Sequence, residues 1–411
     1  MRRLTAIVCL AVITAPVLGD EALAPLMGAI GETKPIAEAR LRFESVDQEP
    51  FAEEAAAVTL RARLGFETGK AWGTSLLVEG EAVIPLDSDY NSTTNGNLTY
   101  PVVADPESYE FNRLQLSNTL IPGTTVTLGR QRITLDDHRF VGNVGWRQNE
   151  QTFDALRVVN RTITDFTIDV SYVNQVNRVF GPDGQGVNVG QYTGDNLLAN
   201  VSWQSAWGKL TGFGYLLKFE ELPQGIRDST QTFGLRLAGE RPLAKVKLAY
   251  IASWATQEDR GANPLSFSND YYLGELNGTY RNYNLGAGYE VLQGDGIKGF
   301  TTPLATLHRF QGWADKFLTT PVNGIVDLYI NAGFQKKGVG PLETLAIAGS
   351  WHKFDSERQS IDYGSELDLQ VQAKFRRFMG TLKYSAYDAS TTTPLTVRDT
   401  DKLWAQVEYT W

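Results

Sequence analysis

The sequence predicts an all-β protein: a transmembrane antiparallel β-barrel of about 18 strands, within a range of roughly 16–20, with long extracellular loops and short periplasmic turns. Three observations predict it. Apolar and polar residues alternate with a period of two along most of the 411 residues. The chain opens on an export-signal pattern, and it ends on an alternating segment with an aromatic last residue.

The composition favours many short strands. The chain carries 39 Gly, 19 Phe, 17 Tyr and 9 Trp but only 3 His and 1 Cys, and aromatic and turn residues are typical of strand-rich folds. After the first twenty residues no stretch reaches the roughly 18 apolar positions that a spanning helix needs, which excludes helical membrane proteins. The net charge of -9 argues against a nucleic-acid partner.

The first residues have the order of a secretory signal peptide. Arg2 and Arg3 precede an apolar run over residues 4–12, and Gly19 offers a small residue at a cleavage site. We therefore expect residues 1–19 to be a signal peptide, residues 20–39 a short periplasmic segment and residues 40–411 an outer-membrane barrel. Cleavage removes the only cysteine, Cys9, so the exported chain needs no disulfide chemistry.

The alternating segments have one apolar face and one charged face. In residues 57–68, for example, Leu60 and Leu64 alternate with Arg61 and Arg63. A soluble sandwich also alternates, but here the apolar faces often end in aromatic residues, as in the girdles of outer-membrane barrels. Each segment has about the length that a tilted strand needs to cross a bilayer. The predicted strands are 40–46, 57–68, 72–86, 110–118, 124–132, 151–160, 165–174, 195–204, 208–219, 231–241, 244–256, 270–280, 282–292, 324–336, 343–354, 365–376, 378–387 and 402–411.

The last segment is the sharpest single mark. Leu403, Val407 and Trp411 lie on its apolar face, and the chain ends on that tryptophan. This resembles the terminal strand that bacterial outer-membrane barrels present to their assembly machinery, although Phe is the usual last residue. We expect the barrel-assembly machinery, outer-membrane lipid and lipopolysaccharide to be partners of the chain.

Short and long connections alternate along the chain and orient the barrel. We expect the short ones to be periplasmic turns and the long ones to be extracellular or inward-folded loops. The short connections are 69–71, 119–123, 161–164, 205–207, 242–243 and 281, and the long ones are 87–109, 133–150, 175–194, 257–269, 293–323 and 388–401. No linker and no longer repeat divides the chain, which indicates one barrel domain.

Nine arginines are candidates for lining a pore, because guanidinium groups bind carboxylates in bidentate pairs and would favour an anionic sugar. Five lie on or near the polar strand faces and four bracket the loop 133–150; they are Arg61, Arg63, Arg113, Arg157 and Arg236, and Arg130, Arg132, Arg139 and Arg147. The alternative is that they pair with acids across strands and only stiffen the wall. The candidate acids are Glu67, Glu79, Glu81, Asp154 and Asp368.

Two blocks of sequence, residues 129–154 and 302–318, resemble the alginate-export family of outer-membrane barrels. The resemblance implies an 18-stranded monomeric barrel over roughly residues 40–411. It also implies export of alginate through an arginine-rich constriction, to which Arg130 and Arg132 would contribute.

The loops 133–150 and 293–323 are expected to fold towards the lumen and set its selectivity. Their candidate constriction residues are Asp136, Asp137, His308, Arg309, Trp313, Asp315 and Lys316. We expect no metal and no cofactor, because only three histidines exist and the segment from Asp87 lacks the glycine and the final glutamate of a calcium loop.

Together these observations predict an outer-membrane, porin-like channel for passive, selective diffusion or export of an anionic saccharide such as alginate or its oligomers. The alternative is a general or uptake porin for small hydrophilic solutes. A third possibility is a barrel with a blocked lumen. An enzyme is not expected, because Ser350 and His352 form only a weak nucleophile–base pattern on one strand.

Overall fold

The structure is a computed structural model that describes residues 20–221 and 223–411. The predicted signal peptide, residues 1–19, lies outside the described residues. Within them, none of the helices has the length and apolar character needed to cross a membrane.

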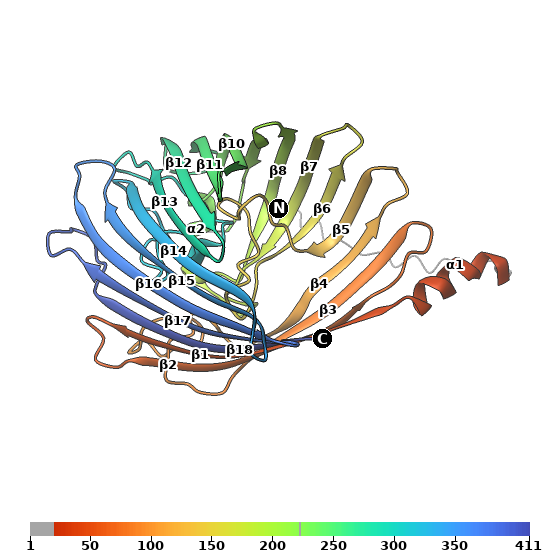
Figure 1. Ribbon diagram of the computed structural model, residues 1–411, viewed down its shortest axis with the longest axis horizontal. Helices are drawn as coiled ribbons and strands as arrows, with labels where there is room; N and C mark the ends of the chain where they lie inside the picture. Colours follow the sequence, from red (N-terminus) through yellow and green to blue (C-terminus); the bar gives the residue numbers. More distant parts are fainter. Residues whose placement is uncertain (1–19, 222) are drawn as a thin grey trace.

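The described chain forms one closed antiparallel barrel of 18 strands (Figure 1). The barrel closes because β1 pairs with β2 on one side and with the last strand, β18, on the other. This confirms the predicted fold class and strand number. The strands are β1 (Lys34–Gln48), β2 (Ala55–Glu67), β3 (Thr74–Pro85), β4 (Ser108–Asn118), β5 (Thr124–Gln131), β6 (Thr152–Asn160), β7 (Phe166–Asn177), β8 (Gln191–Ser205), β9 (Gly208–Leu216), β10 (Thr230–Leu243), β11 (Val246–Asp259), β12 (Ser268–Tyr280), β13 (Tyr283–Leu292), β14 (Ile325–Val339), β15 (Leu342–Asp355), β16 (Asp362–Phe375), β17 (Phe378–Ala389) and β18 (Thr400–Thr410).

Every predicted segment overlaps one of these strands, and the first strand differs most. It begins at Lys34 rather than at residue 40, since Lys34 already pairs with Glu67 of β2. The helix α1 (Asp20–Gly31) occupies most of the predicted periplasmic segment. The other helical pieces lie in loops: α2 (Gln224–Arg227), η1 (Gly186–Asn188) and η2 (Leu307–Arg309).

The two ends of the barrel differ in their connections. The short turns, the start of β1 and the end of β18 share one end, and the long connections share the other. In outer-membrane barrels the end with short turns faces the periplasm. The predicted short connections all lie at this end, at or within two residues of an observed turn.

The outer surface of the barrel is apolar. Leu64 and Leu285 are 69% and 68% exposed, while Arg61 on the alternate face of β2 is buried inside. Aromatic side chains such as Trp72, Tyr283 and Trp411 are exposed where strands end. An apolar band between aromatic girdles is the surface that faces lipid, and this places the closed barrel in the outer membrane.

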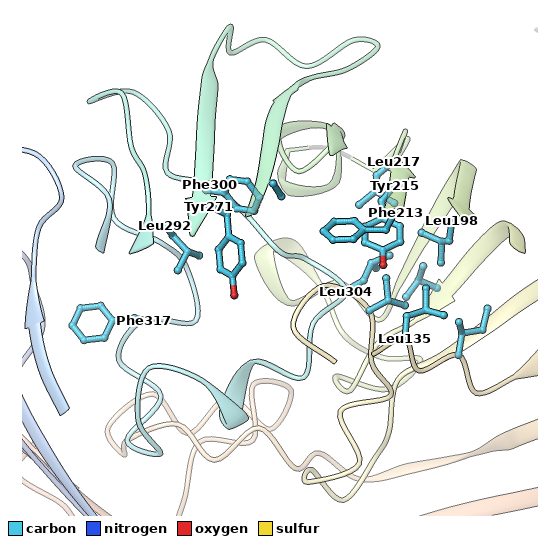
Figure 2. Close-up of a cluster of buried hydrophobic side chains, with 14 of the residues drawn as sticks. Leu135, Leu198, Phe213, Tyr215, Leu217, Tyr271, Leu292, Phe300, Leu304 and Phe317 are labelled. Carbon is cyan, nitrogen blue, oxygen red and sulfur yellow. The ribbon is translucent and has the colours of Figure 1, made fainter. Parts of the chain in front are cut away.

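The main hydrophobic core lies inside the barrel. Two long loops, 132–151 and 293–324, fold inward and pack against the lumen wall (Figure 2). Val141 of the first loop forms a parallel bridge with Leu304 of the second, and Gly142 N donates to Leu304 O at 2.8 Å. Loop side chains such as Leu135 and Phe300 bury themselves among strand residues. Burial of each large apolar side chain contributes about 1.5–3 kcal/mol, so the inward loops are firmly packed.

Candidate functional site

Two cavities inside the barrel lie on opposite faces of residues 308–316. The outer cavity has a volume of about 390 Å³ and includes residues near the extracellular strand ends, such as Gln48 and Phe51. The inner cavity, of about 290 Å³, is lined by mid-strand residues including Glu275 and Asn331. We call them the vestibule and the inner chamber. Residues 308–316, here the dividing segment, contribute to both linings and separate the two spaces.

The vestibule carries an excess of positive charge. Four cationic side chains and one carboxylate line it: Arg147, Arg178, Lys316, Lys402 and Asp315. His308 also lines it, but burial, and after it the neighbouring Lys383, lower the pKa of this imidazole to about 3 despite the opposing effect of Asp315. The histidine is therefore neutral at pH 7, and the vestibule holds three more positive than negative groups when Lys316 is protonated.

Two of these cations have no carboxylate within ion-pair distance among the residues that the structure describes. The Arg178 guanidinium donates to the backbone oxygen of Val189 at 2.9 Å and lies over the ring of Tyr192 at 4.3 Å. The Lys316 ammonium donates to Gln48 Oε1 at 3.0 Å. Burial, followed by the charge of Lys402, lowers the pKa of Lys316 to about 7. Arg178 and Lys316 are therefore the cations most available to a ligand.

The other two cations are held by Asp315. Its Oδ2 accepts from Arg147 Nη2 and from Lys402 Nζ, both at 3.1 Å, and its Oδ1 lies 2.8 Å from His308 Nδ1. Burial disfavours ionisation, but His308, Lys402 and Arg147 outweigh it and hold the pKa of Asp315 well below its usual range. The ionised carboxylate thus joins the two inward loops to β18.

A buried lysine from β17 contacts both inward loops. Lys383 Nζ lies 3.6 Å from the centroid of the Trp313 ring and 4.2 Å from that of Trp146. The same ammonium lies 2.6 Å from His308 Nε2, and the His308 ring stacks on Trp146 at 4.7 Å. Cations bind aromatic faces more strongly where water is excluded, so Lys383 fixes the dividing segment against the wall.

The nine arginines expected to line the pore are all ion-paired. Most of them pair with acids on neighbouring strands or loops, and Glu79, Glu81 and Asp154 of the candidate acids are among the partners. Glu67 and Asp368 form no ion pair with these nine arginines in the described chain. Only Arg147 lines the vestibule. The pairs are Arg61 with Glu38, Arg63 with Glu81, Arg113 with Glu79, Arg130 with Asp154, Arg132 with Glu150, Arg139 with Glu290, Arg147 with Glu44 and Asp315, Arg157 with Asp169, and Arg236 with Asp137.

The predicted constriction residues separate into three groups. Asp136 and Asp137 tie the first loop to the wall through Lys209 at 2.6 Å and Arg236 at 3.0 Å. His308, Asp315 and Lys316 line the vestibule. Arg309 and Trp313 line the inner chamber, and no carboxylate of the described chain lies within 4 Å of the Arg309 guanidinium. The second loop therefore contains the dividing segment, while the part of both loops in selectivity stays a prediction.

Sequence reasoning missed three basic residues, Arg178, Lys383 and Lys402. It also missed Arg42, whose Nη2 donates to the backbone oxygen of Trp146 at 2.5 Å and so anchors the first inward loop on β1. One signal was present: both lysines lie at inward-facing positions of their alternating segments, Lys383 midway along β17 and Lys402 near the extracellular end of β18.

No protein-family model matches the chain, and no functionally curated protein matches it. Solved structures do match. Acinetobacter baumannii OccAB2 is 14% identical with a TM-score of 0.70, over 93% of this chain and 99% of its own. Pseudomonas aeruginosa OccK5 (OpdH) is 14% identical with a TM-score of 0.69, over the same shares of both chains. Pseudomonas aeruginosa OpdK, in a structure with vanillate, is 12% identical with a TM-score of 0.68, over 93% of this chain and 100% of its own.

These matches correct the resemblance to the alginate-export family. The similar structures are Occ and Opd outer-membrane channels, and the alginate-export barrel, although also 18-stranded, belongs to a different family. Residues 129–154 form the end of β5, the first inward loop and the start of β6. This arrangement follows from packing a loop inside the barrel. Within these residues, Arg130 and Arg132 are paired with Asp154 and Glu150. The chain has the fold of the 18-stranded Occ and Opd channels.

Proposed function

We propose that the chain is a passive, porin-like channel for the uptake of small solutes, with a preference for small carboxylates that have an apolar or aromatic body. The observation that carries the proposal is the charge balance of the vestibule, where four cations face one carboxylate. This proposal takes up the uptake-porin alternative and refines it.

The vestibule has the size and chemistry of a small-molecule site. Its volume of about 390 Å³ lies in the usual range of roughly 300–1,000 Å³ for such sites. A carboxylate entering it exchanges water for the donors of Arg178 and Lys316. The apolar part of the solute can contact Phe51 and Phe180, which also line the cavity. The vanillate in the OpdK structure is a solute of this kind and supports the choice.

The internal packing argues against passage of a sugar polymer. A polymer needs one continuous wide path, whereas the dividing segment lies between the vestibule and the inner chamber. Asp315 and the apolar core hold this segment in place. A small solute can pass beside this segment or displace it briefly, so the observed packing is compatible with the passage of small solutes.

The test is single-channel recording of the refolded protein in a planar bilayer under a salt gradient. We expect anion-selective current that vanillate interrupts and that the neutral analogue vanillyl alcohol leaves unchanged. Current that is indifferent to both compounds would indicate a general porin and overturn the carboxylate preference. Cation selectivity would also contradict it, and absence of current would contradict the channel itself.

Matched charge reversals locate the site. Arg178→Glu and Lys316→Glu should each reduce anion selectivity and weaken the effect of vanillate, because each replaces an available cation with an anion. Lys247→Glu is the control, since this exposed lysine at the periplasmic end of β11 makes the same change in charge outside both cavities. An equal effect of all three variants would assign selectivity to net charge rather than to the vestibule.

A further inference from the structure

The helix α1 carries an apolar stripe that the described chain leaves uncovered. Large apolar side chains recur at the spacing that places them on one face of a helix. All of them are exposed, Met27 by 65% and Ile30 by 55%. The stripe consists of Leu23, Leu26, Met27 and Ile30.

The C-terminal end of α1 is fixed to the barrel. Gly69 N, in the turn between β2 and β3, donates to Ala29 O at 2.9 Å, and Ala29 is buried by this contact. A Cβ on Gly69 would come within 3.1 Å of the Ala29 Cα, so the two segments approach closely. In Figure 1 the rest of α1 projects away from the barrel wall. The stripe therefore lies outside the lumen, at the periplasmic end.

This end of the barrel is level with the membrane interface. Phe66 of β2 pairs with Pro35 of β1, and the exposed Trp411 donates its backbone N–H to Ala37 O. Aromatic belts lie at the level of the lipid headgroups. Gly31, where α1 ends, precedes Pro35 by four residues, which span at most about 14 Å. The C-terminal end of the helix thus lies within reach of the periplasmic headgroups.

The neighbouring turns extend the lipid-facing surface towards the helix. Trp72 lies in the same turn as Gly69, and Leu120 and Ile121 lie in the next turn; all three side chains are exposed. These exposed side chains end the lipid-facing belt beside the point where Gly69 holds the C-terminal end of α1. A protein partner would have to compete with the lipid that already covers this belt.

We propose that α1 lies flat in the periplasmic interface of the outer membrane, with its apolar stripe inserted among lipid acyl chains. Its 12 residues give a length of about 18 Å, and short amphipathic helices bind interfaces through such a face. The helix then anchors the start of β1, the strand that closes the barrel, to the leaflet beside it.

The experiment places a fluorophore on each face of the helix. Protein purified from outer membranes, in a Cys9→Ser background, carries either Met27→Cys or Gly28→Cys labelled with the polarity-sensitive dye NBD. A Cβ at Gly28 meets nothing within 4 Å, and this position faces away from the stripe, which makes it the matched control. The variants are reconstituted in phosphatidylcholine vesicles with and without brominated acyl chains.

We expect NBD at position 27 to show a blue-shifted emission and a quenching by brominated lipid several-fold stronger than at position 28. Leu26→Asp with Ile30→Asp should abolish this difference while leaving channel conductance unchanged. Weak lipid quenching with strong iodide quenching at both positions would place the helix in water and overturn the proposal. A blue shift at position 27 without lipid quenching would show a protein contact instead and would also overturn it.

Discussion

Lys316 sets the charge of the vestibule in a range of pH that a bacterium meets. Its pKa is lowered to about 7 by burial and then by Lys402, while Glu366, Asp315 and Asp399 raise it. Lysine is charged below its pKa, so anion selectivity should fall as the pH rises from about 6 to about 8. Reversal potentials measured across this range check the prediction.

Two variants of the same residue separate Lys316 from its neighbours. Lys316→Arg should keep high anion selectivity throughout, because arginine stays protonated. Lys316→Met should show, at every pH, the low anion selectivity that the parent protein has at high pH. A pH dependence that persists in Lys316→Arg would assign the titration to another group. His308 is unsuited to that role, since its pKa of about 3 lies well below this range.

Among the structural elements, the dividing segment depends most on Asp315, which links it to the first inward loop and to β18. Asp315→Asn keeps the shape but leaves Arg147 and Lys402 without their shared carboxylate, and breaking a buried pair costs about 3–5 kcal/mol. We expect the segment to detach, with larger and noisier single-channel conductance and faster proteolysis within residues 308–316. Asp195→Asn is the control, because it also removes an ion-paired carboxylate, but the Asp195 side chain is 60% exposed and its pair with Lys218 is not buried. Equal conductance in both variants would show that the segment does not restrict the path.

The dependence on Asp315 has a definite direction with pH. The pKa of Asp315 is lowered in the folded state. The ionised carboxylate therefore stabilises the docked segment fully above the unfolded pKa of about 3.9, and this stabilisation is lost as the pH falls through the folded pKa. The segment should therefore stay docked at neutral pH and loosen only in strong acid. Conductance noise that rises already in mild acid would point to a different group.

Elements were predictable from the sequence where the alternation was strong. The start of β1 was missed because its outward residues there, Pro35, Ala37 and Ala39, are small and give little apolar signal. Arginine partners were not predictable, because a pair such as Arg40 with Glu408 depends on how the first and last strands align. One signal of the site was available: β12 is apolar on both faces, with Tyr271 buried inside and Tyr272 exposed outside, which marks where an inward loop packs.

At the scale of the whole molecule, stability has two separable layers. The closed ladder of 18 strands holds the barrel, whereas an apolar core inside it holds the loops. Leu304→Ala removes a side chain that is 1% exposed from this core and should cost about 2–5 kcal/mol. Because the ladder does not depend on Leu304, the loss should appear as loop release rather than unfolding of the barrel.

Two measurements distinguish these layers in the Leu304→Ala variant. The heat-modifiable mobility of the folded barrel on a gel should remain as in the parent protein, while proteolysis of the loops and single-channel conductance should both increase. Leu285→Ala is the matched control, because this leucine is 68% exposed on the lipid-facing surface and touches neither loop core nor lumen. If Leu304→Ala instead lowered the temperature at which the barrel itself unfolds, with no change in conductance, then the loops and the strand ladder would form one cooperative unit. The dividing segment would then be a fixed part of the wall, and solutes would have to pass beside it.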